Sequence, residues 1–271
     1  DMETLPTVEY FANLLKLIRR YALPQEGEIL FEARLATDAT KTSDEYGVEI
    51  KDMLDLFGAR VEEIRDCIVA SVVPPVFNSV RNGIVKLTGK EPMVVGPGIK
   101  TGINILLEDP GATGADLIAA AVAAVDAYPT PLTVVDMGTA TTIAVIDDGN
   151  AFLGGAVLPG LRISAEALSS RASLLPGIQL ERPRRAIGKN TVECMQSGLM
   201  FGAAAMVDGL IDRMEAELGR PTTVVATGGV ARFVVPLCRH EIALERDLQL
   251  KGLDLLYRKN RPRKEAAPDP R

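Results

Sequence analysis

Apolar positions along this chain recur at two spacings, one typical of amphipathic helices and one typical of buried strands. Residues 8–21 carry apolar side chains at helical spacing, whereas residues 28–35 and 67–73 are short apolar runs that predict strands. Between these runs, Thr42 and Glu45 have the spacing of a capping box, which predicts the start of a helix. The first part of the chain therefore mixes helices with strands.

The second part of the chain continues this alternation. The pattern predicts helices over 116–127, within 187–217 and over 250–259, and strands over 132–136, 151–157 and 222–226. Alternating strands and helices indicate an α/β fold rather than separate helical and sheet regions. Prolines near residues 128–131 interrupt the pattern and predict two domains of similar size.

Four parts of the chain follow from these breaks. Residues 1–26 form an atypical N-terminal segment with a helical pattern, and residues 27–129 and 130–260 are the two predicted domains. Residues 261–271 are polar and proline-rich, which predicts a disordered tail.

Composition narrows the classes of function. The net charge is −6 and the isoelectric point is near 5.1, so we expect no broad nucleic-acid surface, although a local anion site remains possible. No run reaches the roughly 18 consecutive apolar residues of a membrane helix, and the N-terminus lacks a signal-peptide layout. The three cysteines have neither metal-ligand nor disulfide spacing, which favours free thiols in a reducing cytoplasm.

Residues 134–149, VVDMGTATTIAVIDDG, predict a β-hairpin with a small Gly-Thr turn. Consecutive backbone N–H groups in such a turn attract phosphate oxygens, Thr139 adds a hydroxyl, and Asp136 at the end of the first strand can hold a cation. The simpler interpretation is an ordinary polar hairpin, because threonine is a common strand residue.

Three further motifs carry polar or small residues at the start of a predicted helix. Asp116, after Gly114-Ala115, is either a functional carboxylate or a helix cap, and the local sequence favours the cap. Gly228-Gly229 is either a turn against a nucleotide or simple tight packing. Residues 188–191, GKNT, contain a lysine that either meets an anion or is merely solvated.

The order of these motifs is more specific than any one of them. The chain resembles the type III pantothenate kinases over residues 27–260, and the motifs that carry the resemblance are SVVPP at 71–75, VVGPGIKTG at 94–102, GAD at 114–116, DMGTATT at 136–142, GGA at 154–156, PG at 159–160, GKNT at 188–191 and ATGG at 226–229.

The resemblance implies two ribonuclease-H-like domains of the actin-like ATPase superfamily and phosphorylation of pantothenate by ATP, the first step of coenzyme A synthesis. It also implies Mg²⁺ or another divalent cation, K⁺ or NH₄⁺ as a monovalent cation, and a homodimer. By motif, Asp116 would be the general base, and Gly114, Ala115, Asp116, Leu117 and Thr191 would contact pantothenate, with Thr191 acting across the dimer interface. Asp136 would bind the monovalent cation, and Gly138, Thr139, Gly228 and Gly229 would contact ATP.

The chain departs from the family pattern at two places. Residues 1–26 contain no glycine, so no strand followed by an Asp-x-Gly turn, the family's first phosphate loop, can be drawn there. Leu117 stands where the family usually has an arginine that holds the substrate. Two hypotheses follow: an active pantothenate kinase, or a catalytically weak or inactive homologue that binds a ligand or regulates a partner.

Overall fold

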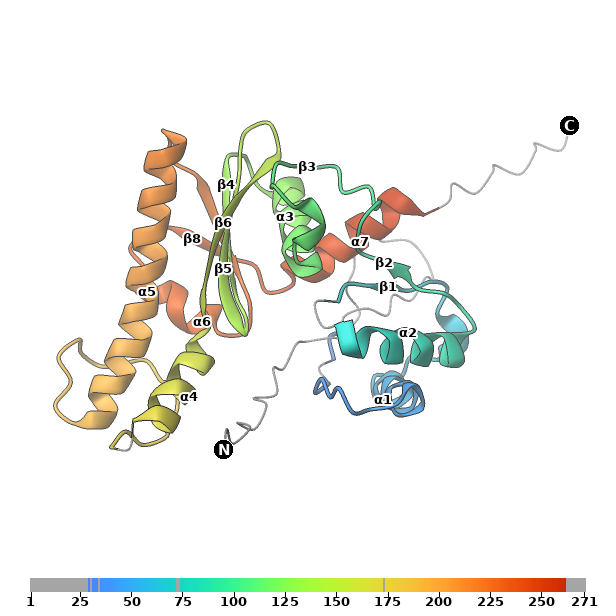
Figure 1. Cartoon of the computed structure of the whole chain (residues 1–271), viewed down its shortest axis with the longest axis horizontal. Coiled ribbons are helices and arrows are strands. Elements are labelled where there is room, and N and C mark those ends of the chain that lie inside the picture. Colours follow the sequence, from blue (N-terminus) through green and yellow to red (C-terminus); the bar gives the residue numbers. More distant parts are fainter. Residues whose placement is uncertain (1–28, 30, 34, 72–73, 173, 262–271) are drawn as a thin grey trace, which may run out of the picture.

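The structure is a computed structural model that describes residues 29, 31–33, 35–71, 74–172 and 174–261. The helix predicted over residues 8–21 and the tail predicted beyond residue 261 lie outside the described residues. The molecule has a large sheet with helices on both faces and a smaller helical unit beside it (Figure 1).

A six-stranded mixed sheet forms the larger part. Its strand order is β3-β6-β5-β4-β7-β8. The bounds are β3 (Asn104–Ile105), β4 (Leu132–Met137), β5 (Ala140–Ile146), β6 (Ala151–Pro159), β7 (Thr223–Thr227) and β8 (Ile242–Leu244). β4, β5 and β6 pair as an antiparallel meander, while β7 lies parallel to β4, and β8 lies parallel to β7. The predicted hairpin is thus the centre of the sheet.

Helices cover both faces of this sheet (Figure 1). α4 (Leu161–Arg171), α5 (Thr191–Leu218) and α6 (Ala231–Val234), followed by the 3-10 turn η3 (Val235–Leu237), lie on one face. α3 (Ala115–Ala127) and α7 (Leu248–Asn260) lie on the other and pack against each other. Two separate apolar cores result, one beneath α5 and one beneath α3.

The smaller unit contains α1 (Ser43–Leu56), α2 (Pro74–Thr88) and a two-stranded parallel sheet of β1 (Ile68–Val69) and β2 (Met93–Val94), with the 3-10 turn η1 (Val61–Glu63) between α1 and β1. A second 3-10 turn, η2 (Pro110–Ala112), connects β3 to α3. α1 and α2 cross closely at Gly83, where an added Cβ would lie 2.8 Å from the Ser43 carbonyl oxygen. Ile68 and Val95 pack with α3 and α7, which therefore lie between the two sheets (Figure 1).

Most predicted elements agree with the structure, but the strand predicted over residues 67–73 is limited to Ile68–Val69 among the described residues. The capping box at Thr42 is present, with Glu45 N donating to Thr42 Oγ1 and Thr42 N donating to Glu45 Oε2. The strand predicted over residues 28–35 is wrong, because its described residues 29, 31–33 and 35 are in no strand. Phe31 instead stacks on Phe57, with ring centroids 4.4 Å apart. An apolar run becomes a strand only where a partner strand accepts its backbone hydrogen bonds.

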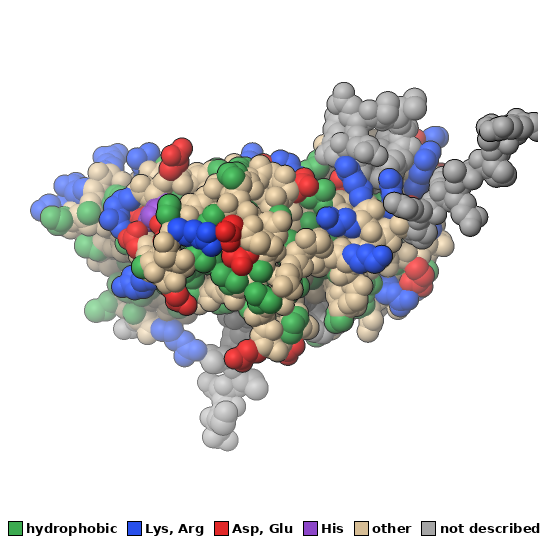
Figure 2. Space-filling view, turned by 90° about the horizontal axis from the view of Figure 1, so that it is seen from above, with side chains coloured by type: hydrophobic (Ala, Val, Ile, Leu, Met, Phe, Trp, Pro, Cys, Tyr) green, Lys and Arg blue, Asp and Glu red, His purple; other side chains and the backbone are tan. Residues whose placement is uncertain are grey.

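Charges of both signs are interspersed over the face that Figure 2 shows, without one continuous basic stripe. α5 is also the one helix, among the described residues, that is long and apolar enough to cross a membrane. Its side chains Leu199, Met200, Val207 and Ile211 are instead buried against the sheet, as in the core helix of a globular protein. The apolar character of α5 is accounted for by this packing.

Candidate functional site

The β4–β5 hairpin turns at Gly138 and Thr139, and Asp136 lies one residue inside it. Asp136 is directly opposite Thr142 on β5 and Thr227 on β7. The Asp136 side chain is 7% exposed and faces α7, whose Gln249 Nε2 donates a 2.5 Å hydrogen bond to Asp136 Oδ2. A buried carboxylate at the mouth of a glycine turn can hold a cation or orient a phosphate.

Two other glycine motifs, Pro159-Gly160 and Gly228-Gly229, pack closely against this turn. A Cβ on Gly160 would lie 1.9 Å from the Thr139 carbonyl oxygen, and a Cβ on Gly228 would lie 2.5 Å from the Met137 carbonyl oxygen. Gly228 also has φ +100°, a conformation that glycine adopts freely. The Pro-Gly motif and the Gly-Gly turn therefore each pack backbone to backbone against the hairpin, where only glycine fits.

Asp116 lies in the first turn of α3. Gly114, not Asp116, is the N-cap of this helix, so the cap interpretation is wrong. Asp116 Oδ1 accepts a 2.9 Å hydrogen bond from the backbone N–H of Leu117, and the side chains of Asp116 and Leu117 are both partly exposed. The backbone of the first helical turn thus fixes the position of Asp116 Oδ1. A partly exposed carboxylate in this position can accept a proton from a bound alcohol.

The start of α3 and the Asp136 end of β4 lie at the same end of the sheet. α3 leads into β4 through residues 128–131 and packs on it, so the helix and strand run in opposite directions. α7 contacts both: Gln249 bonds Asp136, and a Cβ on Gly252 would lie 1.8 Å from the carbonyl oxygen of Ala119, one turn after Asp116. The structure therefore brings the Asp116 and Asp136 motifs around one turn of α7.

Thr191 does not join these residues within one chain. It is exposed at the first position of α5, and α5 lies on the face of the sheet opposite α3 (Figure 1). Asn190 caps this helix by accepting a 2.9 Å hydrogen bond from Glu193 N, and the Lys189 side chain is exposed. In a single chain, the GKNT motif is a helix start with a solvated lysine.

Two buried hydroxyl oxygens lack hydrogen-bond partners in the part of the chain that the structure describes. They are Oγ1 of Thr142, opposite Asp136, and Oγ1 of Thr113, beside the Gly114 cap. Unpaired buried polar atoms are uncommon in native proteins, and an unplaced water or ion is one usual explanation. Both atoms adjoin the candidate site motifs, one at Asp136 and one at Gly114.

The side chains around Asp136 offer oxygen atoms as possible cation ligands. No three His, Cys, Asp or Glu side chains gather as a metal site within the described ranges. The Asp136 carboxylate, the unpaired Thr142 oxygen and nearby backbone carbonyls are all hard oxygen donors, the kind that alkali and alkaline-earth cations prefer.

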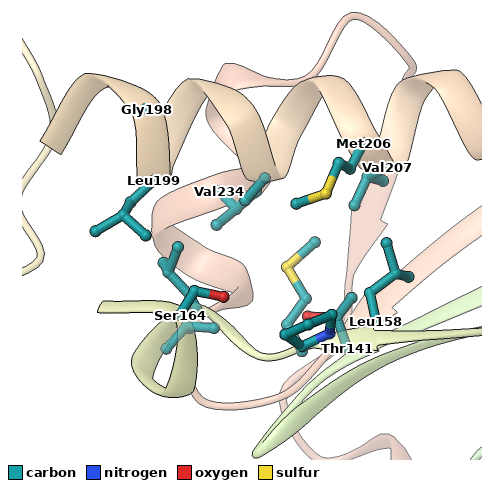
Figure 3. A pocket seen from close by; sticks show the side chains of 13 residues that line it. Thr141, Leu158, Ser164, Gly198, Leu199, Met206, Val207 and Val234 are labelled. Carbon is teal, nitrogen blue, oxygen red and sulfur yellow. The ribbon is translucent and has the colours of Figure 1, made fainter. Parts of the chain in front are cut away.

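A small apolar pocket of about 80 Å³ opens on the α5 side of the hairpin (Figure 3). Its walls include Thr141, Ser164, Leu199, Met206 and Val230. Consecutive strand residues point to opposite faces, so this pocket is on the far side of the sheet from both aspartates. The pocket is therefore separate from the Asp116 and Asp136 motifs.

The only histidine of the chain has a structural environment. Asp208, which is 2% exposed, accepts hydrogen bonds from the backbone N–H groups of Arg239 and His240. His240 Nε2 lies 2.8 Å from Asp212 Oδ1, and this hydrogen bond is the main cause that holds the pKa of Asp212 below its ordinary value. These contacts fix the loop after η3 to α5.

Gln249 is the residue of this site that the sequence pattern does not reveal. A single glutamine in an amphipathic helix has no spacing or motif that separates it from a solvated residue. The predicted helix also began at residue 250, whereas α7 begins at Leu248. The bonded pair becomes visible only when α7 is placed against the end of β4.

Comparison with solved structures gives the class of the protein. A conserved protein from Campylobacter jejuni, described as a Baf family transcriptional activator, is 19% identical, with 76% of this chain and 88% of that chain covered at a TM-score of 0.53. The ethanolamine utilization protein EutJ from Carboxydothermus hydrogenoformans is 16% identical, with 83% and 78% covered at 0.46. An N-acetylglucosamine kinase from Porphyromonas gingivalis is 12% identical, with 88% and 94% covered at 0.46.

Together with the first of these likenesses, the strand order defines the class: an α/β protein of the ribonuclease-H-like, actin-like ATPase fold. The type III pantothenate kinase family model matches residues 20–213. Because that match spans well over half of the chain, the protein belongs to the type III pantothenate kinase family. The matched range includes Asp116, Asp136 and Thr191, whereas Gly228 and Gly229 lie beyond it. The division into domains at residue 130 stays a prediction.

Proposed function

We propose that the protein transfers the γ-phosphate of ATP to the hydroxyl of pantothenate, which gives 4'-phosphopantothenate and ADP. The observation that carries this proposal is the joint packing of Gly160 on Thr139 and of Gly228 on Met137, which brings two glycine backbones directly against the hairpin beside Asp136. Backbone N–H groups of such glycine turns can approach phosphate oxygens closely. The family match supplies the substrate class.

Asp116 acts as the general base in this proposal. The pantothenate hydroxyl gives its proton to the Asp116 carboxylate while its oxygen forms a bond to the γ-phosphorus. The bond from that phosphorus to the bridging oxygen breaks, and ADP leaves with the electron pair. Phosphoryl transfer depends mainly on positioning and charge neutralisation, so one aligned carboxylate is sufficient as protein base.

The remaining parts surround this step. Gly114, Ala115, Asp116 and Leu117 line the pantothenate side, while Gly138, Thr139, Gly228 and Gly229 line the ATP side. Asp136 would hold the monovalent cation, and Mg²⁺ bound to ATP would neutralise phosphate charge. The Leu117 side chain offers only van der Waals contact. The polar groups of pantothenate therefore form their hydrogen bonds with the backbone and with other side chains.

A homodimer belongs to the same proposal. Thr191 is exposed and on the opposite face from Asp116, so its contact with pantothenate needs a second copy of the chain. We place the reaction in the cytoplasm, where free thiols and ATP coexist. No observation in the described residues favours a homologue that only binds a ligand.

The test is a turnover assay with purified protein, ATP, pantothenate, Mg²⁺ and K⁺, in which phosphopantothenate is detected by phosphorus NMR. The matched control is Asp116→Asn, whose amide oxygen can still accept from Leu117 N. We expect product with the wild type and none above background with the variant. A folded wild-type protein that makes no more product than Asp116→Asn would overturn the proposal.

A further inference from the structure

Val157 is an apolar side chain that the sheet and its helices leave uncovered. It lies in β6 directly opposite Thr142 on β5, and Thr142 is in turn opposite Asp136 on β4. The Asp136 side chain is 7% exposed and the Thr142 hydroxyl oxygen is buried, whereas Val157 is 75% exposed. This row of three side chains therefore runs from a buried carboxylate outward to an exposed valine.

Two observations place Val157 on the face of the sheet that carries Asp136. Residues directly opposite one another on neighbouring strands point to the same face, which joins Val157 to Asp136 through Thr142. Leu158, the next residue of β6, lines the pocket on the α5 face, and side chains alternate along a strand (Figure 3). Neighbouring strands are about 4.8 Å apart, so Val157 lies about 10 Å from Asp136.

The start of α3 lies over the same row. Ala121 of α3 packs in one core with the opposed strand residues Val134 and Ala144, which form the row just before that of Val157. Because α3 and β4 run in opposite directions, one turn back along the helix, about 6 Å, matches one row forward along the strands, about 7 Å. That turn of α3 contains Asp116, whose side chain is partly exposed.

β6 is an edge strand at Val157. β3 pairs only with Ala151 and Phe152, so within the described residues no strand lies along the outer side of β6 at Val157. A single exposed valine is ordinary on a protein surface. Val157 differs because it shares the sheet face over which Asp116, the proposed general base, lies. An apolar group of a bound molecule can contact it there without displacing another side chain.

The proposed substrate carries a matching apolar group. The pantothenate hydroxyl that would receive the phosphate belongs to a methylene group, and the adjoining carbon bears two methyl groups. When the hydroxyl is at the Asp116 carboxylate, the two methyl groups lie beside the reacting oxygen. A valine in this position removes them from water, whereas a polar side chain would not.

We propose that Val157 contacts the two methyl groups of pantothenate and thereby sets the preference for this branched alcohol. The inference rests on the proposed kinase reaction, and it adds a residue that lies between the family motifs at 154–156 and 159–160. Burial of one methyl group is worth about a fourfold gain in affinity, so the pair should contribute roughly tenfold.

The test compares pantothenate with an analogue that has hydrogen atoms in place of both methyl groups. Calorimetric titration measures the two Kd values in the presence of Mg²⁺, K⁺ and a non-hydrolysable ATP analogue. We expect the wild type to bind pantothenate roughly tenfold more tightly than the analogue. Val157→Ala should reduce this preference to about threefold, because alanine retains only part of the contact, and should leave the affinity for the analogue unchanged.

The matched control is Val48→Ala, because Val48 is 59% exposed and lies on α1 in the smaller unit. This variant should keep the full preference for pantothenate, and thermal unfolding checks that both variants are folded. If Val157→Ala weakens the binding of both ligands equally, or of neither, Val157 does not contact the methyl groups and the inference is wrong.

Turnover separates this inference from the proposed function. A wild-type protein that phosphorylates pantothenate, with a Val157→Ala variant that keeps the full preference over the analogue, refutes the contact and leaves the kinase. A protein whose preference depends on Val157 but that makes no phosphopantothenate refutes the kinase and leaves the contact. A wild-type protein that binds neither ligand refutes both.

Discussion

Gln249 Nε2 donates a 2.5 Å hydrogen bond to Asp136 Oδ2, and this contact joins the first turn of α7 to the end of β4. The same helix packs on α3 through Gly252, so Gln249 connects the hairpin side of the site with the Asp116 side. The orientation of Asp136 thus depends on a residue 113 positions away in sequence.

Gln249→Leu should weaken both the fold and the cation site. It removes a hydrogen bond to a buried carboxylate, so we expect the free energy of unfolding to fall by about 1.5–3 kcal/mol. The K⁺ concentration for half-maximal activity should rise more than kcat falls, because the carboxylate loses its orientation. Chemical denaturation and turnover at varied K⁺ measure the two effects.

The control for this change is Lys251→Met on the same helix, which removes an exposed ion pair with Glu245. Such pairs contribute about 0–1 kcal/mol, so stability and K⁺ dependence should remain close to those of the wild type. Equal effects of both substitutions would mean that Gln249 acts only through the general stability of α7.

The contact also shows where the sequence is informative and where it is not. The hairpin around Asp136 is predictable, because its apolar alternation and its glycine are local features. Gln249 is not, since its role arises from tertiary packing. The strand over residues 28–35 was predicted from apolarity alone, although a strand also needs a partner. Asp116 resembled a cap because the sequence does not show that Gly114 already occupies that position.

Asp116→Asn should lower kcat by about 10²–10⁴-fold if Asp116 is the general base. The amide oxygen can replace Oδ1 as acceptor for Leu117 N, so α3 should form as before. Steady-state turnover measures the loss, and circular dichroism with thermal unfolding checks the fold. Unchanged turnover would mean that Asp116 only accepts the hydrogen bond from Leu117 N in the first turn of α3 and takes no part in catalysis.

Leu117→Arg should tighten pantothenate binding, because it places a cation beside the proposed carboxylate-bearing substrate. The gain is opposed by about 0.3–1 kcal/mol, the usual penalty of a positive charge near a helix N-terminus. Calorimetric titration with pantothenate measures the net effect, and Leu117→Met is the control of similar volume. If Leu117→Arg and Leu117→Met bind pantothenate with equal affinity, residue 117 does not contribute to substrate recognition.

The thiols should differ in reactivity. Burial raises the pKa of Cys67 to about 11 and that of Cys238 to about 12, whereas Cys194 is exposed. A disulfide reagent at mildly alkaline pH should therefore label Cys194 faster than the other two thiols. The substitution Cys194→Ser should abolish this fast labelling phase. Rapid labelling that survives Cys194→Ser would show that a buried thiol is accessible.

The same pKa shifts give a sign for alkaline stability. A thiol whose folded pKa is raised contributes stability that is fully present below its unfolded pKa, near 8.5. That contribution is lost as the pH rises through the folded values of about 11 for Cys67 and about 12 for Cys238. Above pH 8.5, roughly the unfolded thiol pKa, the Tm of Cys67→Ala should therefore fall less steeply with pH than the Tm of the wild type. Thermal unfolding at several pH values measures the two slopes.

Gly160→Ala should distort the phosphate side of the site, whereas Gly198→Ala should not. Gly160 has φ −66°, so alanine meets no backbone strain, but its Cβ would lie 1.9 Å from the Thr139 carbonyl oxygen. We expect a loss of about 1–3 kcal/mol in the free energy of unfolding, as for other overpacked sites, together with weaker ATP binding. At Gly198, inside α5, no atom beyond the neighbouring backbone of the helix lies within 4 Å of the added Cβ, and alanine there should stabilise the helix by about 0.5–1 kcal/mol. Denaturant unfolding and nucleotide titration of the two variants give the comparison, and a Gly160→Ala protein with wild-type stability and ATP affinity would show that the hairpin tip can move without consequence.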